Sequence, residues 1–412
     1  MSKTNRPCIT YVAIEDPKSG LFKTQVLDLL SQLRKTSPFK IRLCIFIYPW
    51  HLFFRRQCLT RLRETCAERQ ICLHVYPVLL PVKYSLMSVI WFRLTTVWLA
   101  VIAQLLPKSD VVHCRGYFAT FLGLKSRLSG KVIFDTRSSW VDENIAAGRL
   151  AAKSNLHAKW LKFEQRCFRS AAYTIGVSNA MSVVASRGPA QVYETIPIVA
   201  NSSLVGFSKS FRSYMRQQLG WEHRHVAAYS GSLGLDRINK SVLTKLLALL
   251  VQAKADLRFL FLTSEDPDVI GQILRLAGIE EGAARCLAVS SEELGNYLSI
   301  ADFGIHALPL QPDSETRLGT KVVEYWVNGL PVLVTSSVGA AARIINEHGV
   351  GQVLPIGALE GSSHGYELDI SGLNRDNSIR SFKAFDIKQF DIESVAEKYA
   401  RVYELLLRQA LH

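Results

Sequence analysis

The sequence predicts an α/β protein with two successive domains, each built on a doubly wound, mostly parallel sheet. Short apolar segments alternate with longer segments of helical periodicity along the chain, which is typical of parallel sheets covered by helices on both faces. A chain of 412 residues is long enough for two domains with separate cores. Near residue 200 the alternation is interrupted by a proline and several small polar residues, which indicate a linker.

The first half contains six strand candidates with helical segments between them. The helical segments include 22–35, 119–128 and a basic amphipathic stretch at 155–170. From Glu194 onward, "ETIPIVANSS" has the composition of a linker rather than of a strand or helix. The six strand candidates are 9–14, 41–48, 71–78, 111–114, 132–135 and 171–178.

The second half repeats the pattern. A polar, less regular stretch at 357–385 precedes a final helix at 392–408. The strand candidates of this half are 225–229, 258–262, 286–289, 303–307, 331–335 and 351–354.

We therefore expect an N-terminal domain over 1–200, a C-terminal domain over 201–390 and a terminal helix over 391–412 that can cross back to the first domain. Ligands of open parallel sheets bind outside the carboxyl ends of the strands. We expect the two domains to face each other, with the active site in the cleft between them.

Positive charge is concentrated in the first half. Residues 1–200 contain 28 Lys and Arg against 11 Asp and Glu, and residues 201–412 contain 21 against 24. Such asymmetry predicts an anionic partner for the N-terminal half, such as nucleic acid, a phosphorylated substrate or a membrane surface. No interleaved basic and aromatic motif typical of nucleic-acid binding is present. We therefore expect the anionic partner of the N-terminal half to be a lipid surface and not a nucleic acid.

The cysteines and the N-terminus indicate a reduced, cytoplasmic protein. The eight cysteines form no C-x-x-C pair and have no zinc-finger spacing with histidine. Several lie in apolar runs, where a thiol behaves as a small hydrophobic group. The N-terminal segment lacks an apolar stretch long enough for a signal peptide.

Residues 84–106, "YSLMSVIWFRLTTVWLAVIAQLL", form an unusually apolar segment with Arg93 as its single charge. Its length permits a membrane span, but a charge near the centre of a span is costly. Three interpretations stay open: a helix that packs partly on a sheet and partly faces a membrane surface, a buried core helix, and a true span. The first is favoured because Lys83 and Lys108 flank the segment.

The loop after the strand at 225–229 reads "YSGSLGLDRINKSV". Gly231 can bring backbone amides close to an anion, and Arg237 and Lys240 stand at the start of the following helix. Cations are unfavourable in a first turn, so they indicate a negative ligand. The alternative is a glycine turn with two solvated basic residues. The spacing is not that of the dinucleotide-binding fingerprint.

A second motif, "GTKVVEYWVNGLPVLVT", covers 319–335. Thr320 is expected to be the N-cap of a short helix that ends at Asn328-Gly329. Lys321 and Glu324 are three residues apart and share one face of this helix. A carboxylate there can accept both hydroxyls of a ribose while the lysine holds phosphate oxygens. The alternative is an exposed ion pair that contributes little to stability.

These segments resemble a known family. "SETRLGTKVVEYWVNGLPVLVTSSVGAAARIINEHGVGQVLP" (314–355) is similar to the donor-binding region of family-four retaining glycosyltransferases with the GT-B fold, in the branch that makes bacterial cell-surface polysaccharides. "VVHCRGYFATFLGLKSR" and "KVIFDTRSSWVDENIAAG" resemble segments of the same branch, and "VSNAM" and "YSGSLG" follow in the expected order. The resemblance spans residues 8–355.

The resemblance implies transfer of a sugar from a UDP- or GDP-linked donor to a lipid-linked saccharide, with retention of configuration and without a metal or other cofactor. It implies a peripheral position on the cytoplasmic face of the membrane, in capsule or lipopolysaccharide synthesis. The donor-binding candidates are Gly231, Ser232, Gly319, Thr320, Lys321 and Glu324, with Glu324 on the ribose. The catalytic candidates are His113, Arg237 and Lys240, and the acceptor-binding candidates are Gly20, Arg115, Asp135 and Arg137.

The chain departs from the family pattern at three places. The family has a first glutamate that is separated by seven intervening residues from the position of Glu324, and this chain has Thr316 there, preceded by Glu315. Ser232 replaces the usual arginine, which leaves Arg237 or Lys240 to supply positive charge. Gly339-Ala340 replaces the Gly-Asp that the branch tends to have. Two further interpretations stay open: a sugar-nucleotide epimerase with the same architecture, and an inactive subunit of a membrane assembly.

Overall fold

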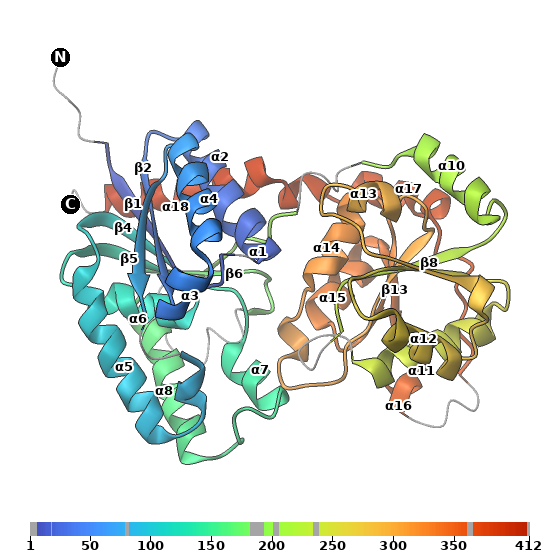
Figure 1. Ribbon diagram of the computed structural model, residues 1–412, viewed down its shortest axis with the longest axis horizontal. Helices are drawn as coiled ribbons and strands as arrows, with labels where there is room; N and C mark the ends of the chain where they lie inside the picture. Colours follow the sequence, from blue (N-terminus) through green and yellow to red (C-terminus); the bar gives the residue numbers. More distant parts are fainter. Residues whose placement is uncertain are drawn as a thin grey trace. The chain divides into compact units, whose positions relative to one another are not determined.

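The computed structural model describes residues 6–17, 19–78, 82–181, 193–200, 206–233, 239–360 and 366–409. The chain divides into two compact units. Unit 1 consists of Met1–Val199 and Ile392–His412, and unit 2 consists of Ala200–Asp391. Figure 1 labels the helices and strands of both units.

Unit 1 is built on a seven-stranded parallel sheet. The strand order is β3-β2-β1-β4-β5-β6-β7, so the chain first adds strands on one side of β1 and then on the other. The elements are β1 (Cys8–Ala13), α1 (Gly20–Phe22), η1 (Lys23–Asp28), α2 (Leu29–Thr36), β2 (Lys40–Ile47), α3 (Pro49–Phe54), α4 (Arg56–Glu68), β3 (Cys72–Pro77), η2 (Val82–Leu86), α5 (Val89–Ile102), η3 (Ala103–Leu105), β4 (Ser109–Arg115), α6 (Tyr117–Lys125), β5 (Ser129–Thr136), α7 (Trp140–Ala146), α8 (Asn155–Ser170), β6 (Tyr173–Gly176), β7 (Tyr193–Thr195) and α18 (Ile392–Arg408).

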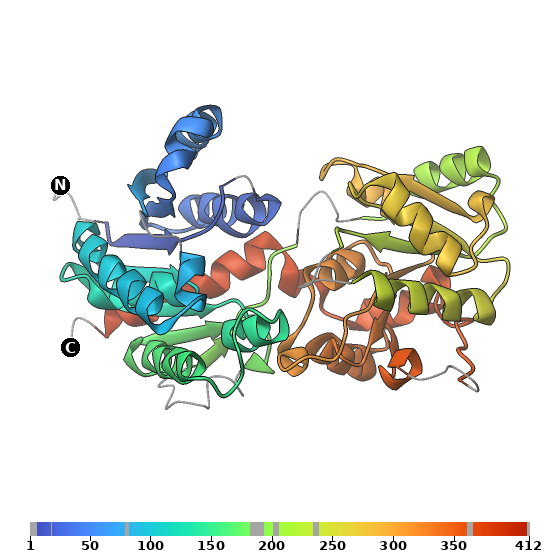
Figure 2. The same cartoon turned by 60° about the horizontal axis from the view of Figure 1, so that its bottom comes forward.

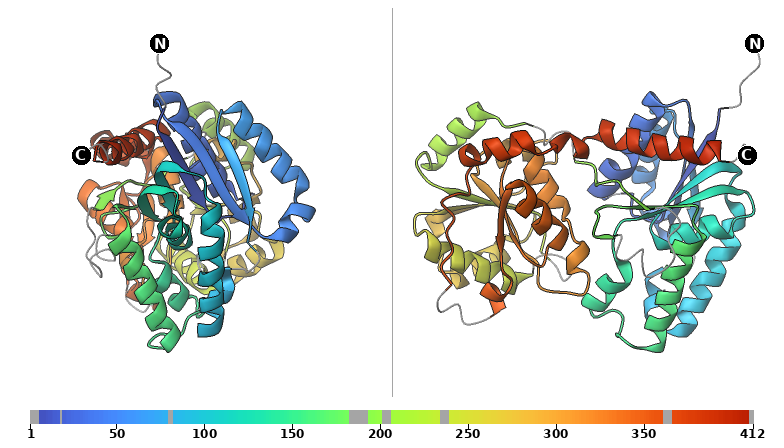
Figure 3. Two further views of the ribbon diagram at one scale, coloured as in Figure 1. Left: turned by 90° about the vertical axis from the view of Figure 1, so that its left-hand side faces the viewer. Right: turned by 180° about the vertical axis from the view of Figure 1, so that it is seen from behind.

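Two layers of helices cover the sheet of unit 1, and they can be followed in Figure 2. Alternate residues of each strand point to opposite faces. Ile9 and Tyr11 of β1 pack with α2, α4 and α18 on one face, whereas Val12 packs with α5, α6 and α8 on the other. The terminal helix α18 lies along this unit, in contact with α2 and β4 (Figure 3).

Unit 2 is built on a six-stranded parallel sheet with the order β10-β9-β8-β11-β12-β13. Helices α11 and α12 pack on one face of it, and α14 and α15 contact β11, β12 and β13. The elements are α10 (Lys209–Leu219), β8 (Val226–Ser230), α11 (Lys240–Ala253), β9 (Arg258–Leu262), α12 (Pro267–Leu276), η5 (Glu281–Ala283), β10 (Ala284–Leu287), α13 (Leu294–Leu298), β11 (Phe303–His306), η6 (Ser314–Thr316), α14 (Thr320–Val327), β12 (Val332–Thr335), α15 (Gly339–His348), β13 (Gly351–Leu354), α16 (Gly357–Glu360), α17 (Arg375–Ala384) and η7 (Ile387–Phe390).

Two expectations about local structure are wrong. The start of the predicted linker forms β7, which pairs with β6 at the edge of the sheet. The stretch predicted to be irregular at 357–385 contains α17, which begins at an N-cap that the sequence analysis overlooked: the Asn374 side chain accepts a hydrogen bond from the backbone of Asn377. Both elements are short, and neither has a strong apolar periodicity.

The apolar segment at 84–106 folds into the end of η2, α5 and η3. One side of α5 is buried through Phe92, Thr95, Leu99 and Ile102. In the part of the chain that the structure describes, no helix combines the length and the apolar character needed to cross a bilayer.

Candidate functional site

The carboxyl ends of β8 and β11 form the topological switch point of unit 2. These strands are parallel neighbours, and the chain builds outward from them in opposite directions. Gly231 follows β8 directly, and His306 is the last residue of β11. Doubly wound sheets bind their ligands at this position, because the loops diverge there and leave a crevice.

Tyr325 fixes α14 against this switch point. Its hydroxyl group accepts a hydrogen bond of 2.8 Å from the backbone amide of Ser230, the last residue of β8. Its fully buried ring packs on Gly304 of β11, where a Cβ atom would lie only 2.5 Å from the ring. Any side chain at position 304 would therefore displace α14. This packing determines where the first turn of α14 lies relative to both strands.

The N-terminus of α14 has no side-chain cap. The helix begins at Thr320, and its N-cap is Gly319, which has φ +77°. The expectation that Thr320 is the N-cap is therefore wrong. The first turn also contains no acidic residue. Amide N–H groups at an uncapped helix start carry partial positive charge and suit an anionic ligand.

Lys321 and Glu324 form an ion pair on α14, with Nζ 2.7 Å from Oε2. The two side chains are 32% and 14% exposed, so this pair is not the exposed one of the alternative interpretation. A Cβ atom at Gly231 would lie 3.4 Å from Cε of Lys321. Gly231 has φ +130°, a conformation that favours glycine. The structure thus brings together Gly231, Gly319, Lys321 and Glu324.

His306 lies beneath the start of α14 and was not among the candidates from the sequence. Its Nε2 atom is buried and has no hydrogen-bond partner among the described residues. A Cβ atom at Gly319 would come within 2.9 Å of this nitrogen. Burial, with smaller contributions from Lys321 and Arg317, lowers the pKa of His306 to about 4. The imidazole is therefore neutral at neutral pH.

The loop before α14 contains an acidic side chain that the sequence analysis also missed. Asp313 pairs with Arg317, with Oδ2 2.5 Å from Nε. Asp313 Oδ1 and Arg317 Nη1 are buried without a described hydrogen-bond partner, whereas Arg317 Nη2 donates to Gln311. Glu315 instead points to the surface and pairs with Arg343 of α15. Asp313 is thus the more buried carboxylate of this loop.

Gly339 lets the start of α15 pack closely against the loop before α14. A Cβ atom at this position would lie 2.8 Å from Cα of Glu315, so α15 and the loop before α14 pack in direct contact. The carbonyl group of Arg317 accepts hydrogen bonds from the amides of Ala340 and Ala341. The first turn of α15 is therefore occupied by the chain itself.

The remaining donor-side candidates lie around the loop after β8. The carbonyl group of Ser232 accepts a hydrogen bond of 3.1 Å from the hydroxyl of Tyr229. Lys240 is the exposed first residue of α11, whose N-cap is Asn239. Arg237 lies outside the described residues.

In unit 1, three predicted residues belong to one buried network. His113 Nε2 lies 3.1 Å from Asp135 Oδ2, and Arg137 Nη1 lies 3.2 Å from Asp135 Oδ1. Two tyrosines of α18 complete it: the hydroxyl of Tyr399 donates to Asp135, and the hydroxyl of Tyr403 lies 2.8 Å from His113 Nδ1.

The charges of this network follow from its partners. Burial would raise the pKa of Asp135, but Arg137 and the hydrogen bond from His113 outweigh it and lower that pKa well below its usual range. Burial lowers the pKa of His113 despite the neighbouring carboxylate. A neutral His113 satisfies every contact when Nε2–H donates to Asp135 and Nδ1 accepts from Tyr403. Both ring nitrogens are then engaged, and the side chain is fully buried.

The two other candidates of unit 1 lie near its own switch point, between β1 and β4. Arg115, the last residue of β4, donates a hydrogen bond from Nε to Glu15, which follows β1. Gly20 is the first residue of α1. Among the described residues, no group of three or more His, Cys, Asp or Glu side chains is arranged to hold a metal ion.

Comparison with protein-family models and with curated proteins finds no match. Among solved structures, sucrose-phosphate synthase from Thermosynechococcus elongatus has a TM-score of 0.67 and 14% identity over 98% of this chain and 100% of that chain. Anabaena HepE in complex with UDP and glucose has a TM-score of 0.64 and 14% identity over 96% and 99%. WaaG, a glycosyltransferase involved in lipopolysaccharide biosynthesis, has a TM-score of 0.53 and 12% identity over 98% of both chains.

Identities this low establish the fold and no more. The two parallel, helix-covered sheets are those of the GT-B fold of these glycosyltransferases. The predicted fold class is confirmed.

Proposed function

We propose that this protein is a retaining glycosyltransferase that moves a sugar from a nucleotide-sugar to a lipid-linked saccharide at a membrane surface, in the synthesis of a cell-surface polysaccharide. The observation that carries the proposal is the Lys321–Glu324 pair, mostly buried, at the uncapped start of α14 and at the switch point of unit 2. The similar fold of HepE, which was crystallised with UDP and glucose, supports a nucleotide-sugar as donor.

The residues at the start of α14 and in the loop after β8 suit different parts of such a donor. The carboxylate of Glu324 accepts hydrogen bonds from the two hydroxyls of a ribose. The amides of Gly319, Thr320 and Lys321, with the lysine ammonium group, hold phosphate oxygens. Gly231 and Ser232, in the loop after β8, border the same proposed donor site. In the reaction, the anomeric carbon of the sugar forms a bond to a hydroxyl oxygen of the acceptor while its bond to the diphosphate breaks. The proton of that hydroxyl goes to the departing diphosphate, whose developing negative charge Lys240 and Arg237 stabilise.

The acceptor side belongs to unit 1. Arg115 and Gly20 stand by its switch point, and Asp135 and Arg137 are held by the network under α18. We assign His113 a positioning role in this network, because both of its nitrogens are engaged by Asp135 and Tyr403. A direct contact of His113 with substrate stays a prediction from the resemblance.

The membrane contact is proposed for the outer side of α5. Exposed apolar side chains recur along it at helical spacing, and Val97 is 64% exposed. Helix α8 lies beside α5 (Figure 1) and carries basic residues on its exposed side. An apolar stripe next to basic side chains complements the interface of an anionic bilayer. The exposed apolar residues of this stripe are Met87, Ile90, Leu94, Val97, Val101 and Leu105.

A thermal-shift screen of nucleotide-sugars tests the donor part. A donor that binds only the folded state raises the free energy of unfolding by about 2.7 kcal/mol at a hundred times its Kd. We expect at least one UDP- or GDP-linked sugar to raise the melting temperature of the wild type and not that of Glu324→Ala. Glu347→Ala is the matched control, because Glu347 is an exposed glutamate on α15. Equal shifts in all three proteins would refute the assignment of Glu324.

A further inference from the structure

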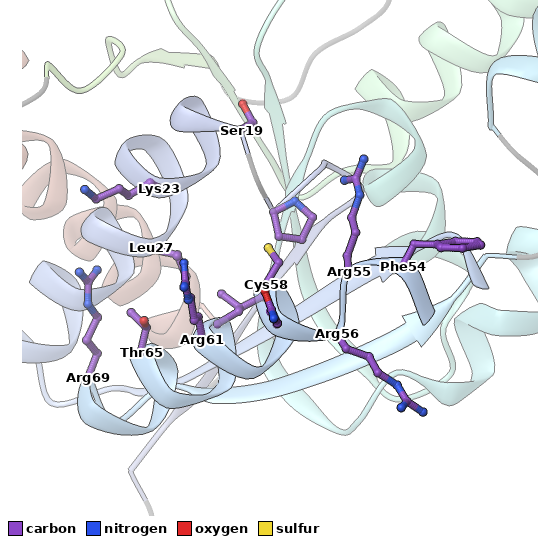
Figure 4. Close-up of a pocket in the computed structure, with 13 residues that line it drawn as sticks. Ser19, Lys23, Leu27, Phe54, Arg55, Arg56, Cys58, Arg61, Thr65 and Arg69 are labelled. Carbon is purple, nitrogen blue, oxygen red and sulfur yellow. The ribbon is translucent and has the colours of Figure 1, made fainter. Parts of the chain in front are cut away.

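Unit 1 contains an open cavity of about 840 Å³ that the function proposed above does not use (Figure 4). One wall is the loop after β1 together with η1, and the other is the end of α3 together with α4. Because β1 and β2 are parallel neighbours, both walls rise from the carboxyl edge of the sheet. The lining residues are Pro17, Ser19, Lys23, Leu27, Phe54, Arg55, Arg56, Gln57, Cys58, Arg61, Leu62, Thr65 and Arg69.

The helical period of α4 explains why cations gather in this cavity. Arg61, Thr65 and Arg69 follow one another at intervals of four residues and share one face. Figure 4 shows Arg61 and Arg69 extending from α4 toward the helix that carries Lys23. Leu27 and Leu62 are buried below them. The cavity thus has an apolar floor and a basic rim.

Positive charge exceeds negative charge around this rim. Five of the lining residues are Lys or Arg, and none of the lining residues that the structure describes is acidic. Arg69 pairs with Asp28 at 2.6 Å, and Arg55 pairs with Asp16. Arg61 makes no ion pair with a described residue. Like charges held this close repel each other, and an anion in the cavity would relieve the repulsion.

One exposed aromatic side chain also lines the cavity. Phe54, the last residue of α3, is 86% exposed and lies next to Arg55 and Arg56 in the sequence. An exposed aromatic ring next to arginines suits a ligand that carries both an apolar chain and a negative group. A free phosphate would not explain an exposed aromatic ring at this position.

From these observations we infer that the cavity binds a phosphoryl group attached to a lipid chain. Lys23, Arg61 and Arg69 hold the phosphoryl oxygens, and Phe54 contacts the first part of the chain. This inference rests on the proposed function, since such a group is the part of a lipid-linked saccharide that anchors it. The inference adds to the proposed function the position at which unit 1 binds the acceptor.

Binding of farnesyl diphosphate to the full-length protein tests the inference. Inorganic pyrophosphate and farnesol serve as the anionic and the apolar part alone. We expect farnesyl diphosphate to bind more tightly than either. Arg61→Gln is expected to weaken both diphosphates about tenfold, the effect of losing one charge-assisted hydrogen bond, and Phe54→Ala to weaken only farnesyl diphosphate. Arg61 is the best position to change, because its removal leaves no described carboxylate without its ion-pair partner.

Arg63→Gln is the matched control, since Arg63 is an exposed arginine of the same helix that does not line the cavity. Equal weakening by Arg61→Gln and Arg63→Gln would overturn the inference, as would the absence of saturable binding to the wild type. Binding of UDP and of GDP, measured on the same proteins, separates the two proposals. If the wild type binds neither nucleotide, the proposed donor is contradicted. If it binds one of them but not farnesyl diphosphate, only the assignment of the cavity is contradicted.

Discussion

Gly319 connects the loop before α14 to the helix in a conformation that other residues adopt at a cost. Its φ is +77°, and a Cβ atom there would meet Nε2 of His306 at 2.9 Å. The first constraint concerns the stability of the backbone. The second concerns the position of the first turn, where the donor phosphates are proposed to bind.

Gly319→Ala separates these two constraints when it is compared with Gly278→Ala. Gly278 has a similar φ of +73° but no atom within 4 Å of its Cβ position. We expect both variants to lose about 1–2 kcal/mol of unfolding free energy in urea titrations, because alanine is strained at positive φ. Only Gly319→Ala should also weaken binding of the nucleotide, UDP or GDP, that the wild type binds, since the start of α14 must shift away from His306. Unchanged affinity for that nucleotide would show that the start of α14 is not part of the donor site.

His113→Ala is expected to lower the free energy of unfolding by about 3 kcal/mol. The substitution removes one of the three partners of the buried Asp135 carboxylate, which keeps Arg137 and Tyr399, and removes His113 as a partner of the Tyr403 hydroxyl. Lost hydrogen bonds of buried polar groups are costly, and so is the space left by a buried ring. His223→Ala, at an exposed histidine, should change it by less than about 0.5 kcal/mol. Equal effects in urea titrations of the two variants would contradict the network.

Some site residues could be predicted from the sequence and others could not, and the difference has a physical reason. Lys321 and Glu324 are neighbours on one helix, so their spacing alone predicted that they meet. His306 and Tyr325 act through contacts between different elements, and no local pattern encodes those. The only sequence signal for His306 was its position at the carboxyl end of a buried strand.

At the scale of elements, the same distinction separates predicted helices from missed ones. Helices α8 and α18 have strong apolar periodicity, and both were predicted with their observed bounds. β7 has three residues, and its pairing with β6 depends on the edge of a sheet that the sequence does not show. The role of α18 in the buried network was also not predictable, because Tyr399 and Tyr403 meet Asp135 and His113 from 264 and 290 residues away along the chain.

Helix α5 gives a prediction that concerns a whole surface. Val97→Glu places a charge in the middle of the exposed apolar stripe, where insertion into a bilayer interface would have to bury it. We expect this variant to float with vesicles that contain anionic lipid at least tenfold less than the wild type.

Leu276→Glu is the control for α5. Leu276 is an exposed leucine of α12 in unit 2, at 69% compared with 64% for Val97. The Leu276→Glu variant should float with the vesicles to the same extent as the wild type. If both substitutions reduce flotation equally, or neither does, α5 is not the membrane contact.

At the scale of the molecule, acid should destabilise the fold through histidines whose pKa is lower in the folded state than in the unfolded chain. Burial lowers the pKa of His113, His225 and His306, the last to about 4. In the unfolded chain each binds a proton near pH 6.5. Between pH 6.5 and 4 the unfolded state therefore binds more protons than the folded state, so the free energy of unfolding falls as the pH is lowered.

His306→Gln tests this sign, because glutamine does not titrate. Urea titrations between pH 7 and pH 4.5 should show a smaller loss of stability in the variant than in the wild type. The same dependence on pH in both proteins would mean that His306 is already protonated or exposed in the folded state.

The two units differ in charge, which agrees with the separate roles proposed for them: acceptor and membrane binding by unit 1, and donor binding by unit 2. The basic excess lies in residues 1–200, which contain the cavity with its basic rim and the exposed basic residues of α8. Unit 2 contains Glu324, the partly buried carboxylate proposed to bind ribose. The sequence predicted this asymmetry from composition alone, but the place where the cations gather depends on how α4 faces η1, which only the structure shows.

The most direct test of the proposed activity is transfer of labelled sugar from nucleotide-sugars into a lipid fraction. The purified protein is incubated with bacterial membranes and each labelled donor, and radioactivity is counted in the organic extract. We predict donor-dependent labelling by the wild type and Glu347→Ala, reduced at least tenfold in Glu324→Ala, since hydrogen bonds to a charged group are lost. No labelled lipid and no released nucleotide with any donor would contradict the account and favour a subunit without activity.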